Sequence, residues 1–189
     1  MKGQWTNIYS GDLALRSWWV DSVNDCKYVS ILLPEVFGIN NWIRSFSEKL
    51  AQQNIPALAL PLYGRTAPYL DLEYSEEDLK LGRHHKNLTT LKNIIDDVSA
   101  AINWVKEKYP SKKISIIGFC FGGHAAFIAS SLKGIESSFC FYGAGIVSLR
   151  NDTNSAPIDL LEKVSGKLNF ICGSSDDLIP LRDRLEIKK

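Results

Sequence analysis

The sequence predicts an α/β protein with a mostly parallel β-sheet, helices on both faces and an antiparallel hairpin at its N-terminal end. From residue 28 onward, short apolar runs alternate with segments of helical spacing, which is typical of parallel strands joined by right-handed helical crossovers. Before residue 28, apolar and polar residues alternate instead. The 189 residues are 45% hydrophobic, enough for one buried core, so we expect a single domain over residues 1–189.

Alternation and helical spacing predict the elements of the first half in chain order. They are a hairpin over residues 8–23, a strand over 28–35, a helix over 41–53 and a strand over 55–60. The hairpin turns at Ser10, Gly11 and Asp12, and the helix carries apolar residues at helical spacing, from Ile43 to Leu50. The continuous apolar run over 28–35 is typical of a strand buried on both faces.

The longest helix is predicted from an Asn87 cap to a stop at Pro110. Its apolar residues step by three and four along one face: Leu88, Leu91, Ile95, Val98, Ile102, Val105 and Tyr109. The remaining predicted elements are a strand over 114–119, a helix over about 121–132, strands over 137–143 and 167–173, and a helix that begins after Pro180.

Residues 61–86 form a long, charged and weakly periodic segment. We expect a partly helical excursion over the carboxyl edge of the sheet. Ligands bind at that edge in open α/β sheets, so this segment is expected to shape the binding pocket.

Composition excludes several classes of function. The formal net charge is +1, and basic and acidic residues alternate along the chain, so no nucleic-acid or anionic membrane surface is expected. The N-terminus lacks the apolar core of a signal peptide and no apolar run is long enough to span a bilayer, so a soluble, cytoplasmic protein is expected. The four cysteines have no metal-binding spacing.

A nucleophile site is indicated at Cys120. The segment GFCFGG places this cysteine between Gly118 and Gly122 at the joint of a predicted strand and helix, the pattern of a nucleophile elbow with cysteine in place of serine. The helix N-terminus is expected to favour the thiolate, and the Phe121 amide would supply half of an oxyanion hole. The alternative is a buried structural cysteine in a glycine-rich turn.

Two further segments are expected at the same edge because they also end strands. In LLPEVFGIN, Glu35 closes the first parallel strand and the Val36 amide would donate the second oxyanion hydrogen bond; the alternative is a capped turn before the helix at Asn41. In ICGSSDDLIP, Asp176 and Asp177 occupy the place where elbow enzymes keep their acid. Adjacent acids after a strand are otherwise ordinary helix starters.

Taken in order, these segments resemble the dienelactone hydrolase family, the cysteine-dependent branch of the α/β-hydrolases. The matching segments are PEVFGIN around Glu35, PLYGRTAP over 61–68, GFCFGG around Cys120, FYGAGI after the next strand, and DDLIP from Asp176. The resemblance covers about residues 28–184 and implies a three-layer α/β-hydrolase-like fold.

The resemblance also implies roles for individual residues. Cys120 would be the nucleophile, Asp176 the acid that orients a histidine, and Glu35 a carboxylate beside the resting thiol that moves when substrate binds, so that the thiolate forms. The implied substrate-binding residues are Arg65, Arg83, Phe37 and Tyr142. Arg65 matches the family's Tyr-x-Arg segment and Arg83 matches more loosely; a planar guanidinium is suited to gripping a substrate carboxylate.

The family places its catalytic histidine after a further strand, beyond the aspartate. The three histidines of this sequence, His84, His85 and His124, all precede Asp176. We expect His124 to be a packing residue, and the other two to lie in a solvated loop, with an improvised base as the alternative. The sequence is therefore expected to lack the last strand and helix of the fold, with the triad histidine and a second carboxylate-binding arginine, through truncation of the gene or of its record.

The expected function is hydrolysis of a small, anionic lactone or carboxylic ester by thiolate attack, through an acyl-cysteine that water releases. The small-molecule substrate is the expected partner, with no cofactor, no metal, no nucleic acid and no membrane. The alternative is a catalytically inactive relative or a small-ligand binding module. Without a further strand, the strand KLNFIC would be an exposed sheet edge through which the chain self-associates.

Overall fold

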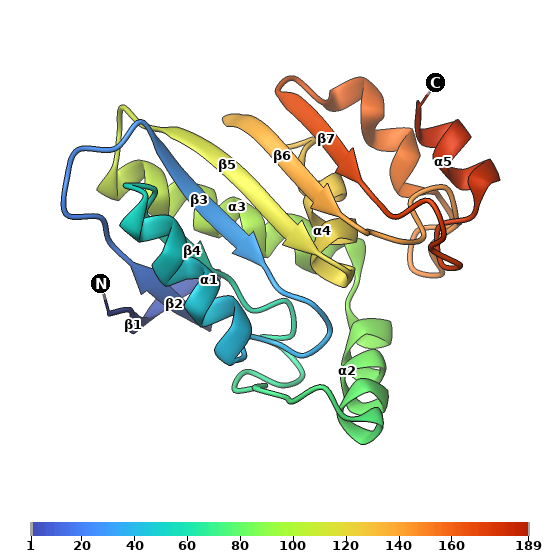
Figure 1. Cartoon of the computed structure of the whole chain (residues 1–189), viewed down its shortest axis with the longest axis horizontal. Helices are drawn as coiled ribbons and strands as arrows, with labels where there is room; N and C mark the ends of the chain where they lie inside the picture. Colours follow the sequence, from blue (N-terminus) through green and yellow to red (C-terminus); the bar gives the residue numbers. More distant parts are fainter. Residues whose placement is uncertain (1, 189) are drawn as a thin grey trace.

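The computed structural model describes residues 2–188 and contains one seven-stranded sheet in the order β1-β2-β4-β3-β5-β6-β7. The strands are β1 (Gln4–Ser10), β2 (Leu13–Val20), β3 (Tyr28–Leu33), β4 (Ala57–Ala59), β5 (Lys113–Phe119), β6 (Ile135–Phe141) and β7 (Lys167–Ile171). The strands from β4 across to β7 are parallel, while β1 and β2 are antiparallel. The predicted α/β architecture is confirmed (Figure 1).

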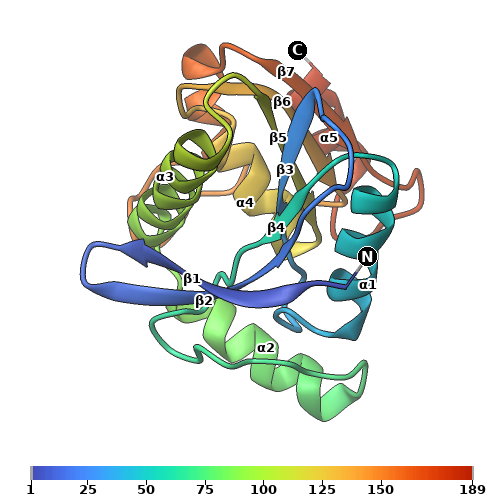
Figure 2. The same cartoon turned by 90° about the vertical axis from the view of Figure 1, so that its left-hand side faces the viewer.

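The helices are α1 (Asn41–Gln52), α2 (Glu76–Leu88), α3 (Leu91–Lys108), α4 (Phe121–Ala129), the 3-10 helix η1 (Pro157–Lys163) and α5 (Leu181–Lys188). Helix α1 packs on one face of the sheet, and α3 and α4 pack on the other (Figure 2). The excursion over residues 61–86 is partly helical, as expected. It leads into α2, which lies below the carboxyl ends of the parallel strands in both views.

The N-terminal hairpin forms one edge of the sheet, and β2 continues it by pairing antiparallel with β4. Gly11 turns the chain with φ 61°, a conformation that glycine adopts without steric cost. Alternate residues of β2, such as Leu15, Ser17 and Trp19, are buried, which is the pattern of a strand with one face on the core. The opposite edge is β7.

The predicted start of the longest helix at Asn87 is wrong. Asn87 and Leu88 end α2 instead, and Thr89 and Thr90 have extended backbones that separate the two helices. The Thr90 side chain accepts a hydrogen bond from the Asn93 amide at 3.1 Å and so caps α3. Apolar spacing runs on across this break, so periodicity alone could not place it.

Helix α4 is shorter than the predicted span to residue 132. It ends at Ala129, where the Ser130 hydroxyl donates to the Phe127 carbonyl at 2.6 Å and the Ser131 hydroxyl donates to the Ile128 carbonyl at 2.7 Å. These bonds occupy carbonyls of the last turn that further helical residues would otherwise use. Every residue of α4 is buried, because the helix lies directly against β3, β5 and β6.

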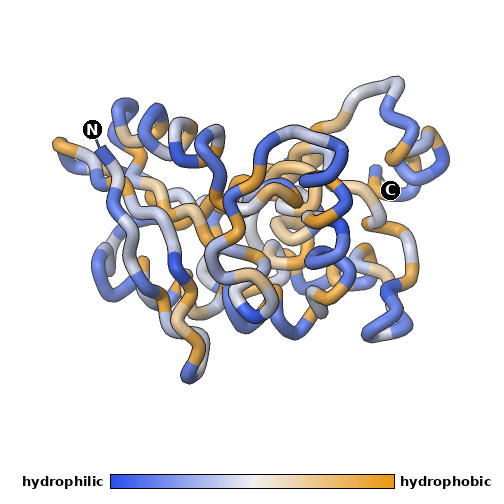
Figure 3. The backbone as a smooth tube through the Cα atoms, turned by 90° about the horizontal axis from the view of Figure 1, so that it is seen from below, coloured by the Kyte–Doolittle hydropathy of each residue, from blue (hydrophilic) through white to orange (hydrophobic). Residues whose placement is uncertain are grey.

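The core divides between the two faces of the sheet. The larger cluster packs α3 and α4 against the sheet, and the smaller one packs Ile43 of α1 against Leu32 and Ala59. Figure 3 shows hydrophilic segments mostly around the outside of the tube, with hydrophobic segments gathered inside. Both faces of the central strands are therefore covered by helices, and the candidate site lies at the carboxyl edge of the sheet.

Candidate active site

Cys120 stands in a strained turn between β5 and α4. Its backbone has φ 54° and ψ −116°, a conformation that costs free energy for any residue with a side chain and that marks functional turns. A Cβ atom at Gly118 would lie 1.9 Å from the carbonyl oxygen of Gly122, and one at Gly122 would lie 2.0 Å from that of Leu33. Only glycine fits at either position, so the motif is required by the geometry of the turn.

Two backbone amides are directed at the Cys120 sulfur. Burial raises the pKa of the Cys120 thiol above its usual value, hydrogen bonds from the Phe121 and Val36 amides lower it, and the Glu35 carboxylate raises it further. The Phe121 amide at the helix N-terminus therefore favours the thiolate, as expected, but burial outweighs both amides and the net direction of the pKa shift is upward. The two amides are nonetheless aimed where a negative charge would develop.

Glu35 follows the end of β3, and two phenols bind its carboxylate. Tyr74 donates to Oε2 at 2.9 Å and Tyr142 donates to Oε1 at 3.3 Å. Burial, followed by the Glu35 charge and its hydrogen bond, raises the pKa of Tyr142, so this phenol stays protonated and remains a donor. Tyr142 directly follows β6, whereas Tyr74 belongs to the segment before α2.

A cavity of about 420 Å³ opens beside Cys120. Its walls come from α2, from α4, and from the segments that follow β3, β6 and β7. The cationic side chains of Arg83 and Lys86 line it from α2, and both are exposed. Within residues 2–188, neither of them forms an ion pair. The cavity therefore combines a half-buried thiol with two cations that form no ion pair within residues 2–188.

His124 lies on α4, one turn beyond Cys120, and both of its ring nitrogens are occupied. Nδ1 is 2.9 Å from the carbonyl oxygen of Ala144, and Nε2 is 2.8 Å from Nη1 of Arg150. Burial lowers the pKa of His124 to about 4, and the nearby Arg150 charge contributes to that lowering. In this arrangement His124 is a neutral, buried and fully hydrogen-bonded side chain.

Arg150 lies in the segment after β6 and binds the junction between α2 and α3. It donates to the Thr89 carbonyl at 2.9 Å and to Oδ1 of Asp152 at 2.9 Å. Burial raises the pKa of Asp152, but hydrogen bonds from the Leu91 amide and from Arg150 outweigh it and lower the pKa overall. The cavity wall is therefore fixed to the α2–α3 junction by charge-assisted hydrogen bonds.

The other two histidines lie on α2, so the expectation that they occupy a solvated loop is wrong. His84 is exposed, while Nδ1 of half-buried His85 is 3.1 Å from the Thr66 hydroxyl. Burial, together with the neighbouring His84, lowers the pKa of His85. Within residues 2–188, no hydrogen bond joins a histidine to Cys120 or to Asp176.

The acidic pair follows β7 at the same edge of the sheet. Oδ1 of Asp176 accepts a hydrogen bond from the Leu178 amide at 2.9 Å, and Asp177 is exposed. Leu178 lines the cavity beside Cys120. Asp176 is thus held by its own loop, next to a residue of the cavity wall.

Two residues implied by the family resemblance lie outside the cavity lining. The Arg65 guanidinium pairs with Asp97 of α3, a carboxylate whose side chain is only 2% exposed. Phe37 is buried and packs edge-on against the Tyr74 ring, with ring centroids 4.6 Å apart. Arg65 therefore acts as the partner of a buried acid, and Phe37 supports a tyrosine that binds Glu35.

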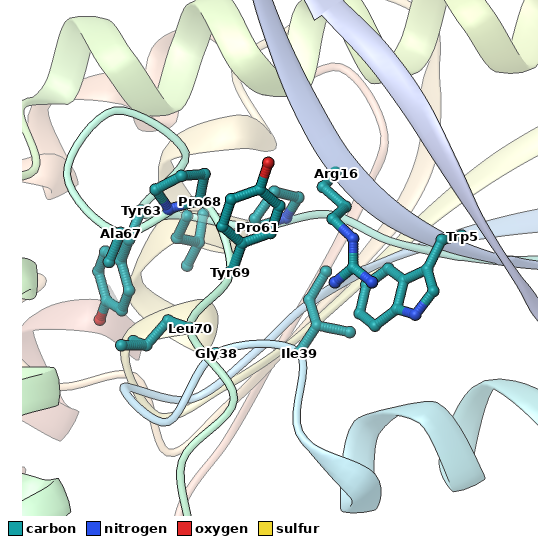
Figure 4. Close-up of a pocket in the computed structure, with 11 residues that line it drawn as sticks. Trp5, Arg16, Gly38, Ile39, Pro61, Tyr63, Ala67, Pro68, Tyr69 and Leu70 are labelled. Atoms are coloured by element: carbon teal, nitrogen blue, oxygen red, sulfur yellow. The ribbon is translucent and has the colours of Figure 1, made fainter.

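A second pocket lies away from Cys120, between the hairpin and residues 61–70 (Figure 4). The Arg16 guanidinium stacks over the Trp5 ring, 3.5 Å from its centroid, and fills one side. The remaining volume is about 10 Å³, room for about one water molecule. This pocket is too small for an organic ligand.

Sequence patterns gave no indication of three residues of the site: Tyr74, Lys86 and Arg150. All three lie in polar segments without clear periodicity, and only the folded chain brings them to the cavity or to Glu35. Within residues 2–188 no group of three or more metal-ligating side chains gathers. No helix of this part of the chain is long and apolar enough to cross a bilayer.

Comparison with known proteins identifies a matching family and relatives that are 25% and 32% identical. The model of the dienelactone hydrolase family matches residues 18–189. The "Putative carboxymethylenebutenolidase" of Synechocystis sp. is 32% identical over 163 residues, which are 85% of this chain and 66% of that protein. The carboxymethylenebutenolidase of Pseudomonas putida is 25% identical over 158 residues, 80% of this chain and 65% of that one. The chain thus spans slightly less than two thirds of the length of these relatives.

Solved structures agree on the fold. The crystal structure titled "Putative Dienelactone Hydrolase" from Klebsiella pneumoniae superposes with a TM-score of 0.84 at 21% sequence identity. The superposition covers 98% of this chain and 77% of that one. At this identity the likeness concerns the arrangement of strands and helices.

Proposed function

The chain belongs to the dienelactone hydrolase family, and from that premise we propose that it hydrolyses a small carboxylic ester or lactone with Cys120 as the nucleophile. The observation that most supports this proposal is the placement of Cys120 in a glycine-flanked turn, with the Phe121 and Val36 amides directed at its sulfur. A structural cysteine would need neither the strained backbone nor two converging donors.

The chemistry follows from that placement. The Cys120 thiolate attacks the carbonyl carbon, and the carbonyl π electrons move to oxygen, where the two amides would stabilise the oxyanion by roughly 3 kcal/mol per donor. When the oxyanion collapses, the C–O bond of the ester breaks, and the leaving alkoxide takes up the proton that the thiol lost and departs as the alcohol. Water then hydrolyses the thioester, which releases the carboxylic acid and restores the thiol.

Two parts of the proposal rest on the family resemblance. Glu35 is the carboxylate beside the resting thiol, and its movement on substrate binding allows the thiolate to form. Asp176 is the acid that orients a histidine. The position of Asp176 after β7, next to a cavity-lining residue, is compatible with that role.

The substrate we propose carries a carboxylate. Arg83 and Lys86 lie one turn apart on α2 and line the cavity with no acidic partner among residues 2–188. Residues three positions apart on a helix share a face, so both cations can reach one anionic group. A guanidinium binds a carboxylate through paired hydrogen bonds.

Hydrolysis of p-nitrophenyl acetate tests the nucleophile. We expect release of p-nitrophenol by the wild type, its loss in Cys120→Ala, and its retention in Cys172→Ser, which removes a half-buried thiol of the loop after β7. Turnover that survives Cys120→Ala would exclude Cys120 as the nucleophile.

A second candidate is a protein that binds a small ligand in this cavity without turning it over. It is favoured by one observation: Nε2 of His124 already accepts a hydrogen bond from Arg150, so this histidine has no free nitrogen for proton transfer. A thiol without a base acylates slowly and deacylates poorly. An acetyl adduct on Cys120 that persists in intact-mass spectra would support the second candidate, and rapid return to the unmodified mass would support the hydrolase.

A further inference from the structure

We propose that Tyr74 and Tyr142 are positioning residues that engage both oxygens of the Glu35 carboxylate, so that neither oxygen accepts a hydrogen bond from the Cys120 thiol, and that they thereby favour formation of the thiolate. The inference rests on the proposed function, because it assigns these phenols a role in setting the nucleophile. It concerns residues that would not touch the substrate's reacting bond.

The two phenols occupy both oxygens of one carboxylate. Tyr74 donates to Oε2 at 2.9 Å and Tyr142 donates to Oε1 at 3.3 Å, from segments 68 residues apart in the chain. Among the described residues, no hydrogen bond joins Glu35 to Cys120, although the Glu35 charge is close enough to raise the pKa of the thiol. The carboxylate is therefore near the sulfur but directed toward the phenols.

The fold supports each phenol separately. The Tyr74 ring packs edge-on against Phe37, and a hydrogen bond from Asn40 also reaches its side chain. Tyr142 has φ 41°, a left-handed conformation that is unfavourable for a bulky residue. Its amide donates to the Ile171 carbonyl at 2.7 Å, which helps to hold that conformation. An unfavourable backbone that directs a side chain onto Glu35 is expected where position matters.

Other ionisable groups also surround this site and remain unchanged in the test. Glu73 acts on Tyr74, and Tyr63 lies close enough to Cys120 to interact with it electrostatically. The remaining groups line the cavity from α2, α4 and the segment after β6: Arg83, Lys86, His124, Arg150 and Asp152. None of them binds Glu35 in the described part of the chain, so the phenols can be tested separately from them.

Removal of one hydroxyl should free one carboxylate oxygen for the Cys120 S–H group. A hydrogen bond from the thiol to a carboxylate stabilises the protonated form and raises the thiol pKa. We therefore expect Tyr74→Phe and Tyr142→Phe each to raise the pKa of Cys120 by about half a unit, or about threefold slower alkylation at neutral pH.

The measurement is the rate of Cys120 alkylation by iodoacetamide as a function of pH, with peptide mass spectrometry to separate Cys120 from the other cysteines. Tyr69→Phe is the matched control, since Tyr69 is exposed on the same segment and its hydroxyl forms no hydrogen bond in the described residues. Tyr74 is also 57% exposed, so Tyr74→Phe should leave the melting temperature unchanged.

A double-mutant cycle identifies Glu35 as the intermediary. In a Glu35→Gln background the charge that the phenols position is gone, so Tyr74→Phe and Tyr142→Phe should no longer shift the alkylation midpoint. The inference would be overturned if the tyrosine substitutions shifted the pH midpoint of Cys120 alkylation equally in the wild-type and Glu35→Gln backgrounds. It would also be overturned if both tyrosine variants had the wild-type midpoint.

The inference and the proposed function fail in different ways. If Cys120→Ala abolishes hydrolysis of p-nitrophenyl acetate but the tyrosine variants leave the pKa of Cys120 unchanged, the proposed function is retained and the positioning role is rejected. If the tyrosine variants raise the pKa of Cys120 but hydrolysis survives in Cys120→Ala, the effect on the thiol is retained and Cys120 is rejected as the nucleophile.

Discussion

Nη1 of Arg150 donates a hydrogen bond to Nε2 of His124 across 2.8 Å. A guanidinium stays protonated in proteins, so Nε2 must be the acceptor, and Nδ1 carries the ring proton toward the Ala144 carbonyl 2.9 Å away. The pair therefore fixes both the tautomer and the neutral charge of a buried histidine. Protonation of His124 would place a second positive charge against Arg150.

This relationship predicts acid destabilisation. The pKa of His124 is lowered to about 4 in the folded chain, whereas an unfolded histidine has a pKa of about 6.5. Between these values the unfolded state binds more protons, so the free energy of unfolding should fall as pH drops from about 6.5 to about 4, by about 3 kcal/mol in total.

Urea unfolding at pH 7, 5.5 and 4.5 measures this loss, and His124→Gln is the comparison. Glutamine can replace a hydrogen bond but does not titrate, so the variant should lose less stability than the wild type over this interval. Parallel pH profiles for the two proteins would contradict the assignment.

The pair of Arg65 with Asp97 predicts a large effect of a substitution outside the cavity. The Asp97 side chain is 2% exposed, so Arg65→Met would leave a buried carboxylate without its cation. We expect a loss of about 3 kcal/mol in the free energy of unfolding, below the upper range for buried pairs because Arg65 is partly solvated.

Lys92→Met is the matched control, because it removes the cationic partner of another acid on α3, the helix that carries Asp97. Lys92 and Asp96 form an exposed pair, with side chains 81% and 40% exposed, and such pairs contribute about 0.5 kcal/mol or less. Equal losses in the two variants by urea unfolding would show that the burial of Asp97 is unimportant.

The elbow predicts that Gly122→Ala is incompatible with the native turn. The new Cβ would lie 2.0 Å from the Leu33 carbonyl oxygen and 2.5 Å from that of Pro34, both backbone atoms that cannot move aside. We expect a loss of several kcal/mol of stability, on the order of other severe overpacking changes. Gly173→Ala is the control, because its Cβ would meet only the Asp176 Cβ at 4.0 Å. A Gly122→Ala variant that melts with the wild type would contradict this geometry.

The edge strand predicts self-association of the 189-residue chain. Within residues 2–188, β7 pairs with β6 on one side only, and Ile171 at its end is 39% exposed. An unprotected edge pairs with other strands, so light scattering should reveal concentration-dependent oligomers, and a charge in Ile171→Lys should reduce them. Val23→Lys, at an exposed residue of the loop between β2 and β3, is the control. A monodisperse wild-type monomer would contradict the prediction.

Local sequence predicted the elbow because the constraint there is local. Gly118, Cys120 and Gly122 lie within five residues, and the turn admits no side chain at either glycine. The order of the strands and of helices α1, α3, α4 and α5 was predicted for a similar reason, since burial on one or both faces imposes a period on consecutive residues, whereas the 3-10 helix η1 was not predicted. The break between α2 and α3 was not predicted. Leu88 ends α2 but fits the apolar spacing of α3, and Thr90 caps the new helix.

The partners of charged and phenolic groups were decided only by tertiary structure. Arg65 was expected at a substrate carboxylate, but the fold pairs it with Asp97, and Glu35 receives hydroxyls from Tyr74 and Tyr142. Burial raises the pKa of the Cys120 thiol despite the helix N-terminus, which no local pattern could indicate. Periodicity records which side of an element is apolar, whereas hydrogen bonds and desolvation depend on which distant segments the packed chain brings together.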